Sequence, residues 1–464
     1  MAAPATPVNA PAPPALDADD LVVVQALLAS RDSPMADRAR AVLRRTAVAW
    51  PRFAAIVVAQ ELAPRCLRVA GDLGLVLPAD VRRAFEQAAA AADVRARRQR
   101  LTLFAFLEAA AARAVPVLLL KGAALANGDY DDPAERHMID VDVLVRPRDV
   151  ARACAAAAAL GHVPGPRALP ALFHRLVHFE LLLQPAFDGM VPIDLHWRLQ
   201  HESLLLTVDH EDLWRRCADT VVCGRPAARL PREAEWLHVA THFFANRGAV
   251  PADAGERELG AVLLDRSGSL HGKWLRDLVI ATERLAAGSP PGGLVAAARS
   301  WSATDHAAAA LAIVQPLLSP RAQAFAAAVG HACALSTPTP GRAATALRAW
   351  QQERAHPALG FRPRALLRLG SWLWPPATWF GRPQPSAVRL LWRRGCHAAA
   401  VLLRSLAAAL LLPIALAVRP LAARRRRAWQ RRARAPAGVM AHVQRMAAFE
   451  CAVAASAPSR GAGS

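Results

Sequence analysis

Lysine and tyrosine are almost absent from this 464-residue chain, which contains only Lys121, Lys273 and Tyr130 of these two types. The seven cysteines form no CxxC pair and their number is odd. This pattern argues against a disulfide framework, and we interpret the cysteines as reduced, mostly buried thiols of a cytosolic protein. The N-terminus lacks a basic region followed by an apolar run, so we expect no secretory signal.

Apolar residues are plentiful, at 54% of the chain, and runs of alanine and leucine favour helix over sheet. The length predicts two or three structural units. Of the net charge of +20, residues 341–464 carry +19, from 21 arginines against Glu353 and Glu450. A basic end of this kind suggests anionic lipid or nucleic acid as a partner, without choosing between them.

The pattern along the chain predicts an α+β protein that is predominantly helical, with a small mixed β-sheet flanked by helical N- and C-terminal regions. The expected stretches are a disordered leader (1–16), a helical region (17–115), the sheet-containing core (116–200), a second helical region (201–335), a Pro/Trp-rich basic helical region (336–434) and a tail (435–464).

The expected core contains four short strands. Residues 117–120 form an apolar run that enters a turn at Lys121-Gly122, and residues 138–145 alternate as strands do. Two further strand-like runs, 178–184 and 190–197, are separated by PAFDG, which predicts a hairpin.

Three aspartates of these strands are the strongest functional signal. Alternation places Asp140 and Asp142 on one face, where two carboxylates repel each other unless a cation or donor groups neutralise them. Mg²⁺ prefers carboxylate oxygens together with substrate phosphates, and a two-metal site would stabilise phosphoryl transfer. Asp194 could complete the site as a third ligand if its strand lies beside the first.

The turn after residues 117–120 suits a phosphate. Gly122 allows close approach of the backbone, and a following helix N-terminus presents N–H groups. Lys121 adds a point charge, and Arg136 would neutralise a triphosphate on the same side.

Each of these residues also has an ordinary structural interpretation. A bare D-x-D most often marks the solvated end of a strand, but here apolar residues on both sides indicate a buried strand, and buried charges need partners. His196 shares a face with Asp194 and could contact substrate, hold the carboxylate or serve the fold. For Tyr130, packing under the turn is favoured over stacking on a base.

Taken together, LLLKGAALANGDY, ERHMIDVDVLV and VPIDLHW resemble the uncharacterised nucleotidyltransferase family of the DNA polymerase β superfamily. The resemblance is strong over residues 115–200 and weaker to about Leu318. In that family Lys121-Gly122 matches the glycine turn, and Asp140 and Asp142 match the metal-binding pair. Asp194 and His196 match the D-L-H-W segment, and Arg136 matches the arginine before D-x-D.

The resemblance implies a Mg²⁺- or Mn²⁺-dependent enzyme that transfers a nucleoside monophosphate from an NTP, such as ATP, to an acceptor and releases pyrophosphate. The resemblance does not name the acceptor. In two-metal chemistry a carboxylate such as Asp194 can take the acceptor proton while bridging metal, and we assign it that role as a hypothesis. Ala123 stands where serine or glycine is usual in the superfamily, which removes one expected phosphate contact.

Two other classes of function stay open from the sequence. One is an inactive nucleotide-binding scaffold, held by the basic end on the cytoplasmic face of a bacterial membrane; the other is an RNA-binding protein, which is less favoured because no RNA-binding module is evident. The apolar run 397–418 approaches the length of a spanning helix but contains Arg404 and Pro413, so peripheral association is favoured over a span.

Overall fold

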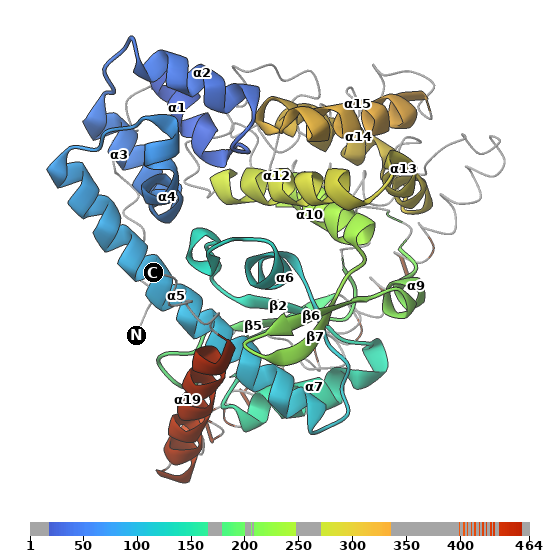
Figure 1. The fold of residues 1–464 in the computed structure, drawn as a ribbon. Helices are drawn as coiled ribbons and strands as arrows, with labels where there is room; N and C mark the ends of the chain where they lie inside the picture. The colour runs from blue at the N-terminus through green and yellow to red at the C-terminus, as the bar shows by residue number, and fades with distance from the viewer. Residues whose placement is uncertain are drawn as a thin grey trace.

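The computed structural model describes residues 18–165, 179–199, 206, 208–246, 271–335, scattered positions between 399 and 431, and 436–456. Helices surround one seven-stranded mixed sheet (Figure 1). The predicted fold class, α+β and predominantly helical, is therefore confirmed.

The N-terminal region consists of helices, as its sequence predicts. These are α1 (Ala18–Leu28), α2 (Pro34–Leu43), α3 (Trp50–Ala59), α4 (Ala63–Leu73) and the long α5 (Ala79–Ala111). A proline lies in the first two positions of α2, α3 and α4, where no N–H partner is lost. Gly74 ends α4 in the left-handed region, at φ 73°.

The sheet has the order β3-β4-β5-β2-β1-β7-β6. The strands are β1 (Leu118–Leu119), β2 (Val141–Leu144), β3 (Val163–Pro164), β4 (Glu180–Gln184), β5 (Ile193–His196), β6 (Ala218–Val222) and β7 (Arg225–Arg229). Strands β4 and β5 pair antiparallel, which confirms the predicted hairpin. Strand β2 pairs with β5 on one side, in parallel, and with β1 on the other side, antiparallel.

Helices cover the two faces of the sheet differently (Figure 1). The C-terminal half of α5 and α7 (Val150–Ala159) bury one face, with Val141, Val143, Ile193 and Leu195 in the same apolar cluster. Towards the other face lie α6 (Lys121–Gly128), α10 (Arg232–Asn246) and α12 (His271–Gly288). Side chains that alternate with the four apolar ones therefore face α6 and the helices beyond it.

The remaining described helices complete the helical layers. They are η1 (Pro133–Glu135), η2 (Pro147–Asp149), α9 (His210–Arg215), α13 (Pro291–Ser300), α14 (Thr304–Val314), η4 (Gln315–Leu317), α15 (Pro320–Leu335) and α19 (Pro436–Ser456). Helix α19 packs on α5, where the rings of Phe104 and Phe449 lie 5.9 Å apart. Part of the predicted tail is thus a packed helix.

The hairpin β6–β7 lies in the stretch 201–335, for which the sequence predicts a helical region and no strand. The two strands are joined by Cys223-Gly224, both at positive φ, as a two-residue hairpin turn requires. The sequence of β7, RPAAR, contains no residue with a high preference for strands. The strand forms because it pairs with β1, and this pairing cannot be predicted from its own residues.

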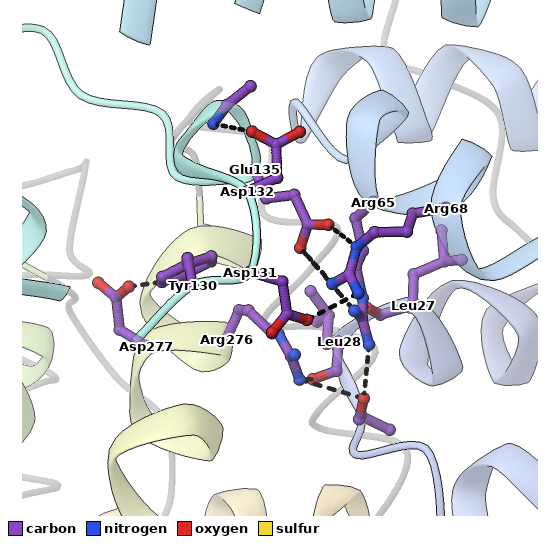
Figure 2. A network of polar contacts seen from close by, with 12 residues as sticks. Leu27, Leu28, Arg65, Arg68, Tyr130, Asp131, Asp132, Glu135, Arg276 and Asp277 are labelled. Carbon is purple, nitrogen blue, oxygen red and sulfur yellow. Dashed lines mark hydrogen bonds and ion pairs between the residues drawn. The ribbon is translucent and has the colours of Figure 1, made fainter. Parts of the chain in front are cut away.

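Arginines tie the N-terminal helices to the core (Figure 2). Arg65 donates to the carbonyls of Leu27 and Ala29, and Arg276 of α12 donates to those of Leu28 and Ala29. These carbonyls end α1 and lack partners within the helix, so the two guanidiniums cap it.

Two sequence predictions lie largely or wholly outside the described residues. They are the leader (1–16) and the region 336–434, including the apolar run 397–418, of which only scattered positions are described. Within the described part of the chain, no helix has the length and apolarity needed to cross a membrane. The six cysteines described there are all free thiols.

Candidate active site

The predicted acidic residues come together where β2 and β5 run side by side. Asp142 and Asp194 are register partners on these parallel strands. Their neighbours in sequence point into the apolar cluster against α5 and α7, so both carboxylates emerge on the opposite face. Asp140 precedes β2 by one residue.

Lys121 neutralises part of this acidic group. It is the first residue of α6, separated from β1 by Leu120, and its Nζ lies 2.7 Å from Oδ1 of Asp142. Its backbone adopts φ 45°, a region that residues other than glycine rarely occupy. Burial alone would lower the pKa of Lys121, but the carboxylates of Asp142, Asp194 and Glu180 together outweigh it and raise this pKa, so the ammonium stays charged.

His196 lies between the carboxylates and is fully buried. Its Nε2 is 3.1 Å from Oδ1 of Asp142 and 3.3 Å from Oδ2 of Asp194, and its Nδ1 is 3.4 Å from Oε2 of Glu180. Burial and Lys121 favour the neutral ring, but the carboxylates prevail and raise the pKa of His196 to about 9. Of the roles open to His196, its geometry supports holding the carboxylates as a cation.

The two acids of the D-x-D motif have pKa values that are shifted in opposite directions. Burial would raise the pKa of Asp142, but Lys121 and His196 hold it well below its usual value. For Asp140, burial and then the charges of Asp142 and Asp194 raise the pKa to about 7. The site therefore contains a carboxylate whose ionised form lacks sufficient positive charge around it.

The donor atoms fit a hard divalent cation. One ligand atom from each of Asp142, Asp194 and His196 lies within 4.8 Å of the others. His196 bears its proton between two carboxylates, so the two aspartates are the better ligands, with Asp140 close enough to interact with both. Carboxylate oxygens are the donors that Mg²⁺ and Mn²⁺ prefer.

Gly122 and Arg136 lie next to each other in the fold. A Cβ on Gly122 would lie 2.5 Å from Sδ of Met138 and 3.2 Å from Cζ of Arg136. Glycine is therefore needed here for these two side chains to pack over the turn. Arg136 is 5% exposed and forms an ion pair with Asp277 of α12, a contact that the sequence gives no reason to expect.

Three further residues around the site are not predicted from the sequence. Glu180 pairs with His196 across β4 and β5, and Lys273 and Asp277 lie one turn apart on α12. Burial lowers the pKa of Lys273 to about 8, although the charges of Asp277 and Asp140 act against that shift. One signal was available: Lys121 and Lys273 are the only lysines of the chain, and both belong to this site.

The mixed sheet thus carries aspartates on adjacent parallel strands, beside the Lys-Gly turn. The chain belongs to the uncharacterised nucleotidyltransferase family, whose model matches residues 46–319. This match includes α3 to α5 as well as the helices after the sheet, so the helical layers on both sides are part of the family's fold.

Two other comparisons add little. No curated protein matches the sequence. Among solved structures, the chain is similar to the antibiotic-resistance factor ANT(2'')-Ia, in a solution structure described as revealing substrate-regulated conformation dynamics. That similarity has 17% identity and covers 41% of this chain and 94% of the other, with a TM-score of 0.24, which is too low to carry an argument.

Proposed function

We propose that the protein transfers a nucleoside monophosphate from an NTP to an acceptor, with release of pyrophosphate, and that it requires Mg²⁺ or Mn²⁺. The observation that carries the proposal is the register pairing of Asp142 with Asp194 on parallel strands, on the face turned away from the α5–α7 cluster. Membership of a nucleotidyltransferase family supports the reaction class.

The charges of the site support the metal requirement. Four carboxylates, those of Asp140, Asp142, Asp194 and Glu180, share the strand face with the cations Lys121 and His196. Even with Lys273 of α12, which interacts with Asp140, the carboxylates outnumber the neighbouring cations by one, and this excess favours binding of a cation. Asp140, Asp142 and Asp194 would hold it, and such an ion would supply Lewis-acid stabilisation of the phosphate oxygens.

The other residues have complementary roles in this proposal. Lys121 lies towards the triphosphate at the start of α6, where the helix N-terminus adds N–H donors, and Gly122 leaves room for Arg136 to pack beside it. Arg136 lies beside that turn and adds a guanidinium. His196 holds the two strand aspartates in place, and Asp194 accepts the proton of the attacking acceptor hydroxyl.

The proposal is tested with each of the four NTPs labelled at the α-phosphate, Mg²⁺ or Mn²⁺, and a fractionated lysate as the source of acceptor. We expect label to move from one NTP to a lysate component. Asp142→Asn should reduce this transfer by at least about 100-fold, because it removes charge from the centre of the site. The matched control is Asp219→Asn, an exposed aspartate on β6 of the same sheet, which should transfer at the wild-type rate.

The outcomes separate the proposal from its alternatives. Full transfer by Asp142→Asn contradicts the assignment of the site. Nucleotide binding by the wild type without transfer to any fraction identifies a scaffold. The chemistry of the labelled product then defines the acceptor class.

For the basic end of the chain, we propose peripheral association with anionic lipid on the cytoplasmic side of the membrane. The support is its charge of +19 and the run of four arginines at 424–427. Replacing these four with glutamine should reduce cosedimentation with vesicles containing phosphatidylserine. Unchanged sedimentation, or salt-sensitive binding to single-stranded RNA instead, contradicts the proposal.

A further inference from the structure

Arg136 is held by a residue from a distant part of the chain. Its Nε donates to both carboxylate oxygens of Asp277, at 2.7 and 3.0 Å, and the two side chains are 5% and 2% exposed. The pair joins the segment before β2 to α12, 141 residues later in the sequence. A buried ion pair offers little net stability over an apolar pair of similar size, so its presence suggests a role beyond stability.

Tyr130 fixes the Asp277 carboxylate from a second side. Its hydroxyl donates to Oδ1 of Asp277 at 2.8 Å, as the dashed line in Figure 2 shows. Burial and the charge of Asp277 raise the pKa of Tyr130 well above its usual value, so the hydroxyl keeps its proton and remains a donor. The only tyrosine of the chain is thus used to orient an acid that lies outside the strand cluster.

The anchored guanidinium lies beside the phosphate turn. Its Cζ would be 3.2 Å from a Cβ placed on Gly122, and its Nη1 donates to the carbonyl of His137. Within the described part of the chain, Nη2 makes no hydrogen bond. Arg136 also interacts with the charge of Asp142, so its guanidinium lies within electrostatic range of the strand aspartates.

We propose that Asp277 is a positioning residue of the nucleotide site. By holding Nε of Arg136, it sets the plane of the guanidinium so that the remaining N–H donors point to the phosphates of the bound nucleotide. A planar guanidinium binds phosphate well only in the correct orientation, whereas an untethered one must lose side-chain freedom on binding. This inference rests on the proposed function for the location of the nucleotide, and Asp277 itself does not contact the substrate.

The experiment measures the affinity for each of ATP, GTP, CTP and UTP with Mg²⁺ by calorimetry, alongside the transfer rate. The variants are Asp277→Asn, Arg136→Gln and the double variant. Each single variant should weaken binding of the preferred NTP by about 10-fold, the effect of one lost contact to a charged group. The double variant should also lose about 10-fold, rather than about 100-fold, because Asp277 acts only through Arg136.

Three variants guard against loss of folding. The double variant replaces the buried ion pair by two neutral amides and leaves no charge unpaired, so its affinity can be compared with that of Arg136→Gln even if Asp277→Asn does not fold. Tyr130→Phe keeps the ion pair and should weaken binding by only about 3-fold. Asp277→Glu keeps the charge and should recover most of the affinity.

Several results would overturn the inference. These are wild-type affinity in folded Asp277→Asn, a double variant that binds clearly more weakly than Arg136→Gln, or equal loss of affinity for the nucleoside that lacks phosphates. If the wild type binds an NTP but transfers nothing, the proposed reaction fails while the affinities still decide the role of Asp277. If it binds no NTP, both proposals fail.

Discussion

Two buried charge clusters of this protein differ in how their charges are balanced. On one side of α6, Arg229 and Arg284 contact Asp129 and Glu235, so that two cations meet two anions. On the strand face, four carboxylates meet three cations: Lys121 and His196, which contact Asp142, and Lys273, which interacts with Asp140 through its charge. We call the first the balanced cluster and the second the acidic site.

The difference separates a structural use of charge from a functional one. In the balanced cluster each buried group has an opposite partner, so the charges are already neutralised and connect α6, β7 and α10. In the acidic site the unmatched charge appears in Asp140, whose pKa rises to about 7. A site that carries excess negative charge in its free form is prepared for a cation, at a cost in stability.

The largest expected effect comes from disrupting the balanced cluster. Arg229→Ala would leave Asp129 and Glu235 buried beside each other, which should lower the free energy of unfolding by about 3–5 kcal/mol. Urea denaturation measures this. As the control, Arg97→Ala removes an ion pair to Glu450 in which both side chains are about half exposed, and should change stability by no more than about 1 kcal/mol. Equal effects would contradict the distinction between buried and exposed pairs.

An intermediate effect is expected from metal at the acidic site. Mg²⁺ or Mn²⁺ at 100 times its dissociation constant should raise the free energy of unfolding by about 2.7 kcal/mol. In Asp142→Asn the increase should largely disappear, because the ion loses one of its ligands, whereas Asp219→Asn should retain it. The same increase in both variants would place the cation elsewhere.

The smallest effect should have the opposite sign to the first. Because the folded-state pKa of Asp140, about 7, exceeds its ordinary value of 3.8, its ionised form opposes folding, and stability should fall as pH rises from about 4 to about 7. Without metal at pH 8, Asp140→Asn should therefore raise the free energy of unfolding and flatten that pH dependence, while transfer falls at least about 100-fold. A loss of stability would contradict the account of unmatched charge.

Local patterns in the sequence predict much of the strand arrangement. The alternation in MIDVDVLV and VPIDLHW identifies β2 and β5, and PAFDG identifies the hairpin that leads into β5. The parallel pairing of β5 with β2 is a contact between distant segments, so the sequence could state it only as a condition for Asp194 to join the site.

The contribution of α12 could not be predicted at all. Asp277 reaches Arg136 only because α12 lies beyond α6 on this side of the sheet, and no local pattern records which distant helix covers a site. Similarly, Arg136 reads as a free phosphate ligand in the sequence, because its burial and its partner depend on tertiary packing. Strand β7 escaped prediction for the same physical reason, since β1 and β6 stabilise it.

The central claim is that the acidic site catalyses nucleotidyl transfer, and the position of the transferred phosphorus tests it most directly. One NTP is supplied in two forms, labelled at the α- or the γ-phosphate, with Mg²⁺ and the acceptor fraction. We predict that the α-label becomes attached to the acceptor while the γ-label leaves in pyrophosphate, and that Asp142→Asn does neither. Attachment of the γ-label to the acceptor, or equal transfer by Asp142→Asn, would contradict the claim.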